Sequence, residues 1–237
     1  MEKFKIANLR VDMNILYPRL KQQALKYKTK ESTPADITIQ LSKTFYEKRQ
    51  KENIHLSISD IEYLYAGFYF YNKLLEFNGF MLHSSAICKD NFAYLFSADS
   101  GVGKSTQASN WMKYFKNETI FYINDDKPAI RKMEDTFYCC GTPFSGKMDL
   151  SSNCIVPVKA IIFIKRGQVN KIKKMPSKEA IHKIFKQTIH SLPEDKMDKL
   201  LNLLNDLLNL IPIYELECNM DIESAKVAYE YIQNDTK

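Results

Sequence analysis

Two hydrophobic patterns organise the first third of the chain. Apolar residues either alternate with polar ones, which is typical of half-buried strands, or recur every three to four residues, which is typical of helices. The run Ser59-Asp60-Ile61-Glu62 places a serine and a glutamate three positions apart, and this capping-box pattern predicts a helix start. The predicted strands lie at 4–13 and 37–41, and the predicted helices at 19–27, 44–52 and 59–77.

From residue 80 onward, predicted strands and helices alternate. Two of the strand pairs are separated by short polar turns and predict β-hairpins, at 80–96 and 129–140. The remaining strands are predicted at 119–123, 158–165 and 213–218, and the helices at 104–115, 177–190, 194–210 and 222–233. Such alternation is typical of α/β folds. We therefore expect an N-terminal α+β layer over 1–78 and an α/β core over 79–237.

Composition narrows the class of protein. Of the 237 residues, 45% are hydrophobic and 26% are charged, which excludes a mainly disordered chain. The longest apolar stretch, near 64–71, is far shorter than the roughly 18–20 residues that span a bilayer, so we expect no membrane association. The net charge is +6, but the lysines are scattered, and we therefore expect no nucleic-acid partner.

The termini and cysteines suggest a location. The first residues alternate between polar and apolar and lack a long apolar run, so we expect no secretory signal. The five cysteines show no CxxC spacing, and an odd number favours reduced thiols. These features predict a cytoplasmic protein without structural zinc.

A glycine-containing loop carries the clearest chemical signal. The chain has only seven glycines, and two of them lie between a predicted strand and a helix that opens with Lys104-Ser105-Thr106. This is the context of a P-loop (Walker A motif), in which backbone amides and a helix N-terminus bind phosphates. Lys104 is expected on the β- and γ-phosphates and Ser105 on Mg²⁺. Ala98 stands where the first glycine is usual, which requires a negative φ there. The expected ATP-binding residues are Asp99, Ser100, Gly101, Val102, Gly103, Lys104, Ser105 and Thr106.

Two consecutive carboxylates end the next predicted strand. Asp125 and Asp126 follow Asn124 at the carboxyl end of a strand that comes after the P-loop helix. Neighbouring residues on a strand point to opposite faces, which predicts different roles for the two. We assign Asp126, with Ser105, to Mg²⁺ and Asp125 to the general base that accepts a proton from an attacking hydroxyl. The reverse assignment, with Asp125 on the metal, stays open.

These pieces together resemble the catalytic domain of HPr kinase/phosphorylase and, more distantly, the nucleotide domain of phosphoenolpyruvate carboxykinase. The resemblance rests on Asp99-Ser100-Gly101-Val102-Gly103-Lys104-Ser105, on the aspartate pair, and on His83 within Leu82-His83-Ser84-Ser85-Ala86. It covers about residues 79–166. It implies a P-loop core of the HPr kinase/phosphoenolpyruvate carboxykinase type with a mixed sheet, and an N-terminal α+β addition. The implied activity is an Mg-ATP-dependent kinase (a phosphotransferase) acting on a hydroxyl, such as serine, of a protein, peptide or small molecule. Such kinases form oligomers, so a homo-oligomer is expected.

The sequence also departs from that family. The family's run Leu-Glu-Ile-Arg-Gly after the aspartate pair is absent, and 141–149 stands in its place with Asp149 as a weak replacement for the missing metal-binding glutamate. We predict that 141–147 forms a flexible loop that brings Lys147 to the transferred phosphate. Arg166, at the end of a buried strand, is a further candidate for phosphate binding. With the resemblance, His83 is expected to contact a phosphate or the acceptor.

Two other functions are compatible with this sequence. The first is a nucleotide-binding switch that changes conformation on binding ATP without efficient transfer, which the missing glutamate and the aromatic-rich N-terminal layer suggest. The second is a carboxykinase-like enzyme acting on a small molecule. It would need an arginine-rich anion pocket, and only Arg131 and Arg166 lie near the motifs.

Overall fold

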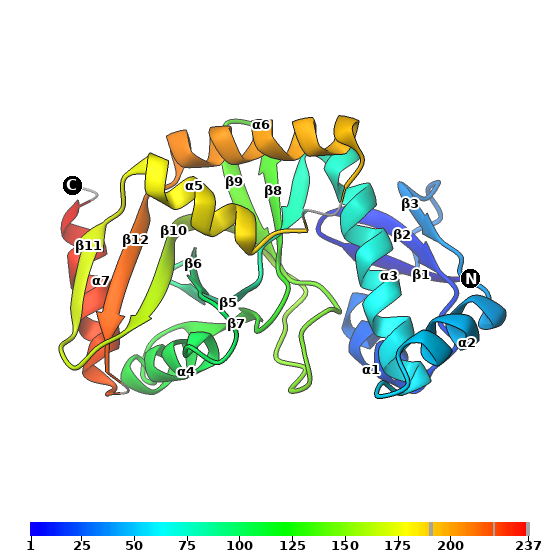
Figure 1. Cartoon of the computed structure of the whole chain (residues 1–237), viewed down its shortest axis with the longest axis horizontal. Coiled ribbons are helices and arrows are strands. Elements are labelled where there is room, and N and C mark those ends of the chain that lie inside the picture. The colour runs from blue at the N-terminus through cyan, green and yellow to red at the C-terminus, as the bar shows by residue number, and fades with distance from the viewer. Residues whose placement is uncertain (190–191, 220, 236–237) are drawn as a thin grey trace.

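The computed structural model describes residues 1–189, 192–219 and 221–235, which form a mixed α/β fold (Figure 1). Two sheets organise these residues: a three-stranded sheet in the N-terminal part and a nine-stranded mixed sheet in the rest. The N-terminal part lies at one end of the molecule, and α3 (Ile58–Leu74) stands between it and the large sheet (Figure 1). The mixed α/β class expected from the sequence is confirmed.

The N-terminal layer forms where the alternating pattern predicts it. Strands β1 (Glu2–Ile6) and β2 (Leu9–Met13) pair antiparallel, and β3 (Ile37–Ile39) runs parallel to β2. The helices of this layer are α1 (Pro18–Ala24), α2 (Lys43–Glu52) and α3. Their buried side chains form one apolar cluster, which also contains Met81, Ala129, Cys140 and Phe144 from beyond residue 78. The N-terminal layer therefore shares a hydrophobic core with the start of the large sheet.

Helix α3 begins two residues before the position that the capping-box pattern predicts. Its N-cap is Ser57, whose hydroxyl oxygen accepts the amide proton of Asp60 at 3.1 Å. The Ser59 hydroxyl instead accepts from the amide of Arg19, and the buried Glu62 carboxylate accepts from the amides of Leu16 and Tyr17. The predicted cap is wrong because Ser59 and Glu62 bind the start of α1, and Ser57 is left to satisfy the free amides of α3.

The large sheet has the order β4-β8-β9-β10-β6-β5-β7. Strand β12 pairs with β10 on the side opposite β6, and β11 pairs with β12. Most of its strands fall within the predicted ranges. The run predicted as one strand at 80–88 is divided between β4, which pairs with β8, and β5, which pairs with β6 and β7. The strands are β4 (Gly79–Met81), β5 (Ser84–Lys89), β6 (Phe92–Ser97), β7 (Ile120–Asn124), β8 (Ala129–Met133), β9 (Thr136–Cys140), β10 (Ile155–Arg166), β11 (Lys171–Lys174) and β12 (Ile213–Cys218).

Strand β10 organises the two faces of this sheet. It lies between β6 and β12, parallel to both, and its side chains alternate between two apolar clusters. Ile161 and Phe163 belong to the cluster that includes residues of α5 and α6, whereas Ile162 and Ile164 belong to the cluster of α4 and α7. The helices therefore cover both faces of the sheet (Figure 1). Their bounds are α4 (Lys104–Tyr114), α5 (Ser177–Lys186), α6 (Glu194–Leu210) and α7 (Glu223–Asp235).

Strand directions bring four segments to one edge of the sheet. Strand β5 is antiparallel to both β6 and β7, so β6 and β7 run in the same direction. The carboxyl ends of β6, β7 and β10 and the amino end of β5 therefore meet at one edge. The glycine loop, the aspartate pair, Arg166 and His83 all extend from these ends. The topology thus gathers residues that are far apart in the sequence.

Two further differences from the sequence-based prediction concern the C-terminal half. Strand β11 was not predicted, because only Ile172 of its four residues is buried and its lysines hide the alternation. Helix α5 ends at Lys186, and His190, where the sequence predicts its end, lies outside the described residues. In the described part of the chain, no helix has both the length and the apolar character needed to cross a membrane.

Gly141 allows two backbone segments to touch, which gives a prediction for stability. A Cβ atom at this position would lie 1.7 Å from the carbonyl oxygen of Ser152. We expect Gly141→Ala to lower the free energy of unfolding by about 3 kcal/mol, since backbone atoms of the buried loop must move apart. Urea unfolding measures this change. The matched control is Gly101→Ala, where a Cβ meets nothing within 4 Å but φ is +77°. We expect a cost of only about 1 kcal/mol there, and equal losses in both variants would contradict the crowding argument.

Candidate functional site

The glycine loop joins β6 to α4 in the conformation that its sequence predicts. Gly101 and Gly103 have φ values of 77° and 135°, which L-residues adopt only with strain. Ala98 is not among the residues with positive φ, so alanine is tolerated where a glycine is usual. Ser100 and Asp99 are exposed beside this turn, and Thr106 lies in the first turn of α4. The predicted strand, loop and helix are therefore all present.

The loop presents free hydrogen-bond donors. Within the described residues, no acceptor is found for the amides of Gly103, Lys104 and Ser105, which lie at the start of an eleven-residue helix. The Lys104 ammonium donates to the carbonyl of Ala98 at 3.0 Å. Burial lowers the pKa of Lys104, while the nearby carboxylates of Asp126, Asp99 and Asp125 act in the opposite direction. Amides, helix dipole and cation together make this loop able to bind an anion.

Arg166 lies beside the loop from the end of β10. Its guanidinium donates to the carbonyl of Val102 at 3.1 Å and to the carbonyl of Gly101. The side chain therefore braces the outer turn of the loop through two backbone carbonyls. The side chain is exposed, and the guanidinium has further donors that these two contacts do not use.

Asp125 extends from the end of β7 toward the loop. Burial raises the pKa of Asp125, and hydrogen bonds from the hydroxyls of Ser85 and Ser105 lower it in part. Those two hydroxyl oxygens lie 3.3 Å apart. One carboxylate oxygen, Oδ1 of Asp125, is buried and has no hydrogen-bond partner in the described residues. A buried carboxylate oxygen without a donor is the environment that a cation would stabilise.

The residues around Asp125 offer few ligands for a metal ion. No three histidine, cysteine or acidic side chains gather into a metal-binding group in the part of the chain that the structure describes. Mg²⁺ needs fewer protein ligands, because it keeps several waters and shares the oxygens of nucleotide phosphates. One carboxylate and one hydroxyl, from Asp125 and Ser105, fit that requirement.

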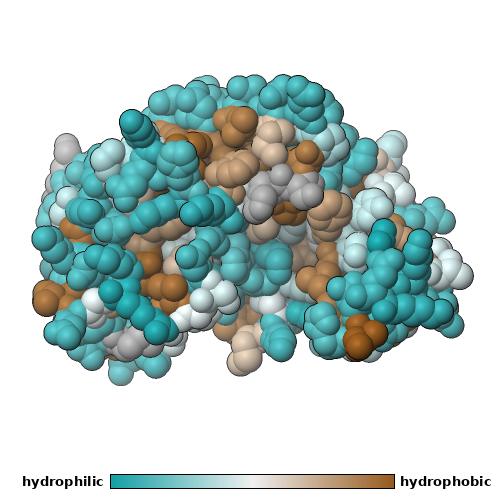
Figure 2. Space-filling view, in the orientation of Figure 1, coloured by the Kyte–Doolittle hydropathy of each residue, from teal (hydrophilic) through white to brown (hydrophobic). Residues whose placement is uncertain are grey.

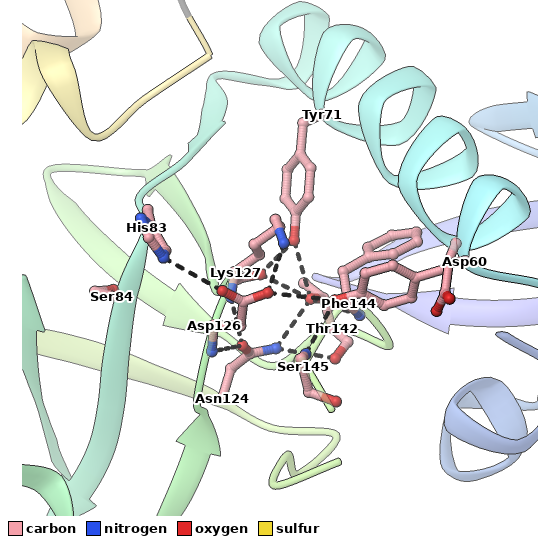
Figure 3. A network of polar contacts seen from close by, with 12 residues as sticks. Asp60, Tyr71, His83, Ser84, Asn124, Asp126, Lys127, Thr142, Phe144 and Ser145 are labelled. Atoms are coloured by element: carbon pink, nitrogen blue, oxygen red, sulfur yellow. Dashed lines mark hydrogen bonds and ion pairs between the residues drawn. The ribbon is translucent and has the colours of Figure 1, made fainter. Parts of the chain in front are cut away.

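The Asp126 carboxylate lies between His83 and Lys127, beneath α3 (Figure 3). One of its oxygens lies 3.4 Å from Nε2 of His83, and the other lies 2.5 Å from the Lys127 ammonium and 3.4 Å from the Tyr63 hydroxyl. Burial acts to raise the pKa of Asp126, but hydrogen bonding by His83 and the charge of Lys127 outweigh it and hold the pKa at about 2. This carboxylate is therefore ionised at neutral pH.

Asn124 fixes the turn that separates the two aspartates. Its buried side chain accepts from the amides of Asp126 and Lys127 at 2.9 and 2.8 Å and donates to the carbonyl of Thr142 (Figure 3). The amide of Asp125 donates to the carbonyl of Leu150. The turn thus gives the two carboxylates different partners, Ser85 and Ser105 for Asp125 and His83, Lys127 and Tyr63 for Asp126.

Gln187 is a site residue that the sequence analysis missed. Its side-chain amide donates to the Asp99 carboxylate at 3.1 Å, and its side-chain oxygen lies 3.2 Å from Nδ1 of His83. Its backbone carbonyl also accepts from the amide of His83 at 2.8 Å. Gln187 thus links the glycine loop to the histidine that contacts Asp126. No motif marks it, because it follows the end of α5, 104 residues from His83 and 88 residues from Asp99 along the chain.

The loop after β9 differs from the prediction. Residues 141–145 are buried, with Phe144 packed against the rings of Tyr63, Phe70 and Tyr71 at centroid distances of 5.6 to 5.9 Å. The expectation of a flexible closing loop is wrong for these residues, because burial of Phe144 holds them in place. Lys147 is exposed, and no hydrogen bond or ion pair of its side chain is found within the described residues. Asp149 pairs with Lys26 at 3.2 Å, away from the aspartate pair.

Comparisons with known proteins show a likeness to solved structures only. No family model matches the chain, and no curated protein matches it. Among solved structures, the chain is similar to the structure of the Hpr(Ser) kinase/phosphatase from Coxiella burnetii, with 9% identical residues and a TM-score of 0.39. The match covers 66% of this chain and 99% of that chain. A likeness of this degree does not identify a reaction, so the site geometry is what supports the function proposed below.

Proposed function

We propose that this protein is an ATP-dependent kinase that transfers the γ-phosphoryl group to a hydroxyl of an acceptor. The observation that carries the proposal is that the two carboxylates at the end of β7 have different partners next to the glycine loop. Asp125 lies beside the P-loop serine, Ser105, and Asp126 lies beside His83 and Lys127. In phosphoryl transfer, one carboxylate can hold the metal of the nucleotide while another accepts the proton of the acceptor.

The glycine loop is proposed to bind the phosphates of ATP. The amides of Gly103, Lys104 and Ser105, at the N-terminus of α4, provide donors, and the Lys104 ammonium provides the charge. Asp125 and Ser105 would hold Mg²⁺, which supplies positive charge beside the phosphates when bound. Arg166 would keep the outer turn of the loop in place through the carbonyls of Gly101 and Val102. The nucleotide side of the site thus consists of the loop, Asp125 and Arg166.

Asp126 is proposed as the general base on the acceptor side. The acceptor oxygen forms a bond to the γ-phosphorus while the bond from that phosphorus to the β,γ-bridging oxygen breaks, and ADP leaves. The proton of the acceptor hydroxyl passes to the Asp126 carboxylate. This reverses the first assignment made from the sequence. A general base must lie within reach of the proton that it accepts, and this requirement comes before its pKa. Asp125 is more basic, but its contacts are to Ser85 and Ser105 on the nucleotide side.

Gln187 is proposed as a positioning residue that couples the loop to His83. Replacing it with leucine removes both side-chain hydrogen bonds at nearly constant volume. We expect kcat to fall about ten- to a hundredfold, with a smaller change in the KM for ATP and an unchanged unfolding midpoint. Steady-state kinetics, with the acceptor that the labelling experiment below identifies, measures kcat and the KM for ATP separately. An unaltered kcat would remove Gln187 from the account, and Gln168→Leu, at an exposed glutamine, is the control.

The experiment that tests the proposal uses γ-labelled ATP, Mg²⁺ and an extract of the host cell. Wild-type protein and Asp126→Asn are compared, and each preparation is first shown to bind ATP. Label in a macromolecule or metabolite with the wild type alone supports the kinase and provides the acceptor for identification. An ATP-binding wild type that labels nothing overturns the proposal in favour of the nucleotide-binding switch.

A further inference from the structure

An apolar pocket opens beside the proposed base. Its volume is about 160 Å³, and its walls come from α3, from the buried loop that carries Phe144, and from β4. A Cβ atom at Gly67 would lie 3.1 Å from the Phe144 ring, so glycine lets this ring pack closely against α3 in the wall of the pocket. The lining residues are Tyr63, Leu64, Gly67, Phe68, Tyr71, Met81, Lys127, Phe144 and Ile189.

The pocket is continuous with the acceptor side of the site. Tyr63 and Lys127 line it, and the same two side chains contact the Asp126 carboxylate at 3.4 and 2.5 Å. Figure 3 shows Lys127, Phe144 and Tyr71 gathered around Asp126 beneath α3. A group that fills the pocket therefore contacts the two side chains that hold the Asp126 carboxylate.

A second pocket continues from the first along α3. It has a volume of about 250 Å³ and is lined by Asn53, Leu56, Ile61, Leu64, Tyr65 and Phe68. Leu64 and Phe68 belong to both pockets, and they are 41% and 39% exposed. These two side chains thus form the ridge between adjoining hollows, and Figure 2 shows apolar surface between α3 and the core. Together we call the two pockets the α3 groove.

The size and charge of the α3 groove indicate what it accepts. Each pocket is smaller than the roughly 300 Å³ at which sites for whole small molecules begin. Two small adjoining pockets instead suit successive side chains of one extended chain. The cations near the groove are already paired, Arg19 with Asp60, Arg49 with Glu52 and Lys127 with Asp126. The α3 groove can therefore select its ligand by apolar contact and not by charge.

We propose that the α3 groove binds the acceptor, and that the acceptor is a polypeptide segment with apolar side chains next to its phosphorylated hydroxyl. The first apolar side chain fills the pocket beside Asp126, and a second fills the pocket beyond Leu64 and Phe68. This inference rests on the proposed function and names its substrate class. It also gives the N-terminal layer a role, since α3 carries most of the groove.

The test uses synthetic serine peptides with glycine at all other positions, in which leucine or phenylalanine is moved through the three positions on either side of serine. Phosphorylation by γ-labelled Mg-ATP is measured, and peptide binding is measured separately with a non-hydrolysable ATP analogue. We expect an apolar residue to raise kcat/KM at defined positions on one side of serine. Leu64→Ser should lower that preference about tenfold, and Leu64→Met should restore most of it.

Two controls keep this test decisive. Leu201→Ser changes an equally exposed leucine on α6, outside the groove, and should keep the wild-type preference. Urea unfolding midpoints equal to that of the wild type show that each variant keeps its structure. Equal use of glycine-flanked and apolar peptides, or label found only in a metabolite, would overturn the groove while leaving the kinase in place. Binding of apolar peptides that depends on Leu64, in a protein that transfers no phosphate, would support the groove and reject the kinase.

Discussion

Replacing Lys104 with alanine will weaken the binding of ATP about thirty- to a hundred-and-fiftyfold, because the phosphates lose a charge-assisted hydrogen bond worth about 2 to 3 kcal/mol. Among the residues that the structure describes, the ammonium donates only to the carbonyl of Ala98, and burial lowers the pKa of Lys104. Its removal therefore breaks one internal hydrogen bond and leaves the fold intact. Calorimetric titration with ATP and Mg²⁺ measures the loss.

The matched control for this variant lies on the same helix. Lys113 is exposed in the last turn of α4, so Lys113→Ala removes an equal charge far from the loop. We expect it to leave ATP affinity unchanged. If Lys104→Ala bound ATP as well as the wild type, the glycine loop would not be the nucleotide site, and the function proposed here would be lost with it.

Replacing each of the two aspartates with asparagine will impair a different step, phosphoryl transfer for Asp126 and Mg²⁺-dependent binding of ATP for Asp125. Asp126→Asn removes the proposed base, and we expect transfer to fall about a thousandfold while Mg-ATP still binds. Asp125→Asn removes the proposed metal ligand, and we expect ATP binding to lose its dependence on Mg²⁺. Titrations with and without Mg²⁺, together with transfer rates, separate these two effects.

An exposed carboxylate serves as the control for both variants. Asp135 lies in the turn between β8 and β9, so Asp135→Asn changes the same charge at a distance from the site. Its binding and transfer should match those of the wild type. A result in which Asp125→Asn keeps Mg-dependent binding and Asp126→Asn loses it would restore the assignment first made from the sequence.

Hydrophobic periodicity was sufficient to locate most elements of this fold. It succeeded in the core because strands such as β10 place alternate side chains on two helix-covered faces. Periodicity failed where contacts between distant parts of the chain determine the bounds of an element. Ser57 and Ser59 both satisfy the rule for an N-cap, and only the docking of α1 on Ser59 and Glu62 shows which one is used. Strand β11 escaped because a lysine-rich edge strand has almost no apolar alternation.

The parts of the candidate site that consist of neighbouring residues in the sequence were predictable. The glycine loop and the aspartate pair are short motifs, and their positions at strand ends follow from sequence order. The partners of Asp125 and Asp126 were not predictable, since they depend on the turn that Asn124 holds. The loop at 141–147 was expected to move because its residues are small, yet Phe144 fixes it in an aromatic cluster.

One measurement tests the central claim most directly: the amounts of ADP and phosphoester formed in a single turnover of enzyme-bound Mg-ATP with the acceptor. The account predicts one phosphoester on a hydroxyl for each ADP, and neither product above background with Asp126→Asn. ATP that stays bound and intact in the wild-type protein, with the acceptor present, would contradict the account and identify the site as one that binds nucleotide without transferring phosphate.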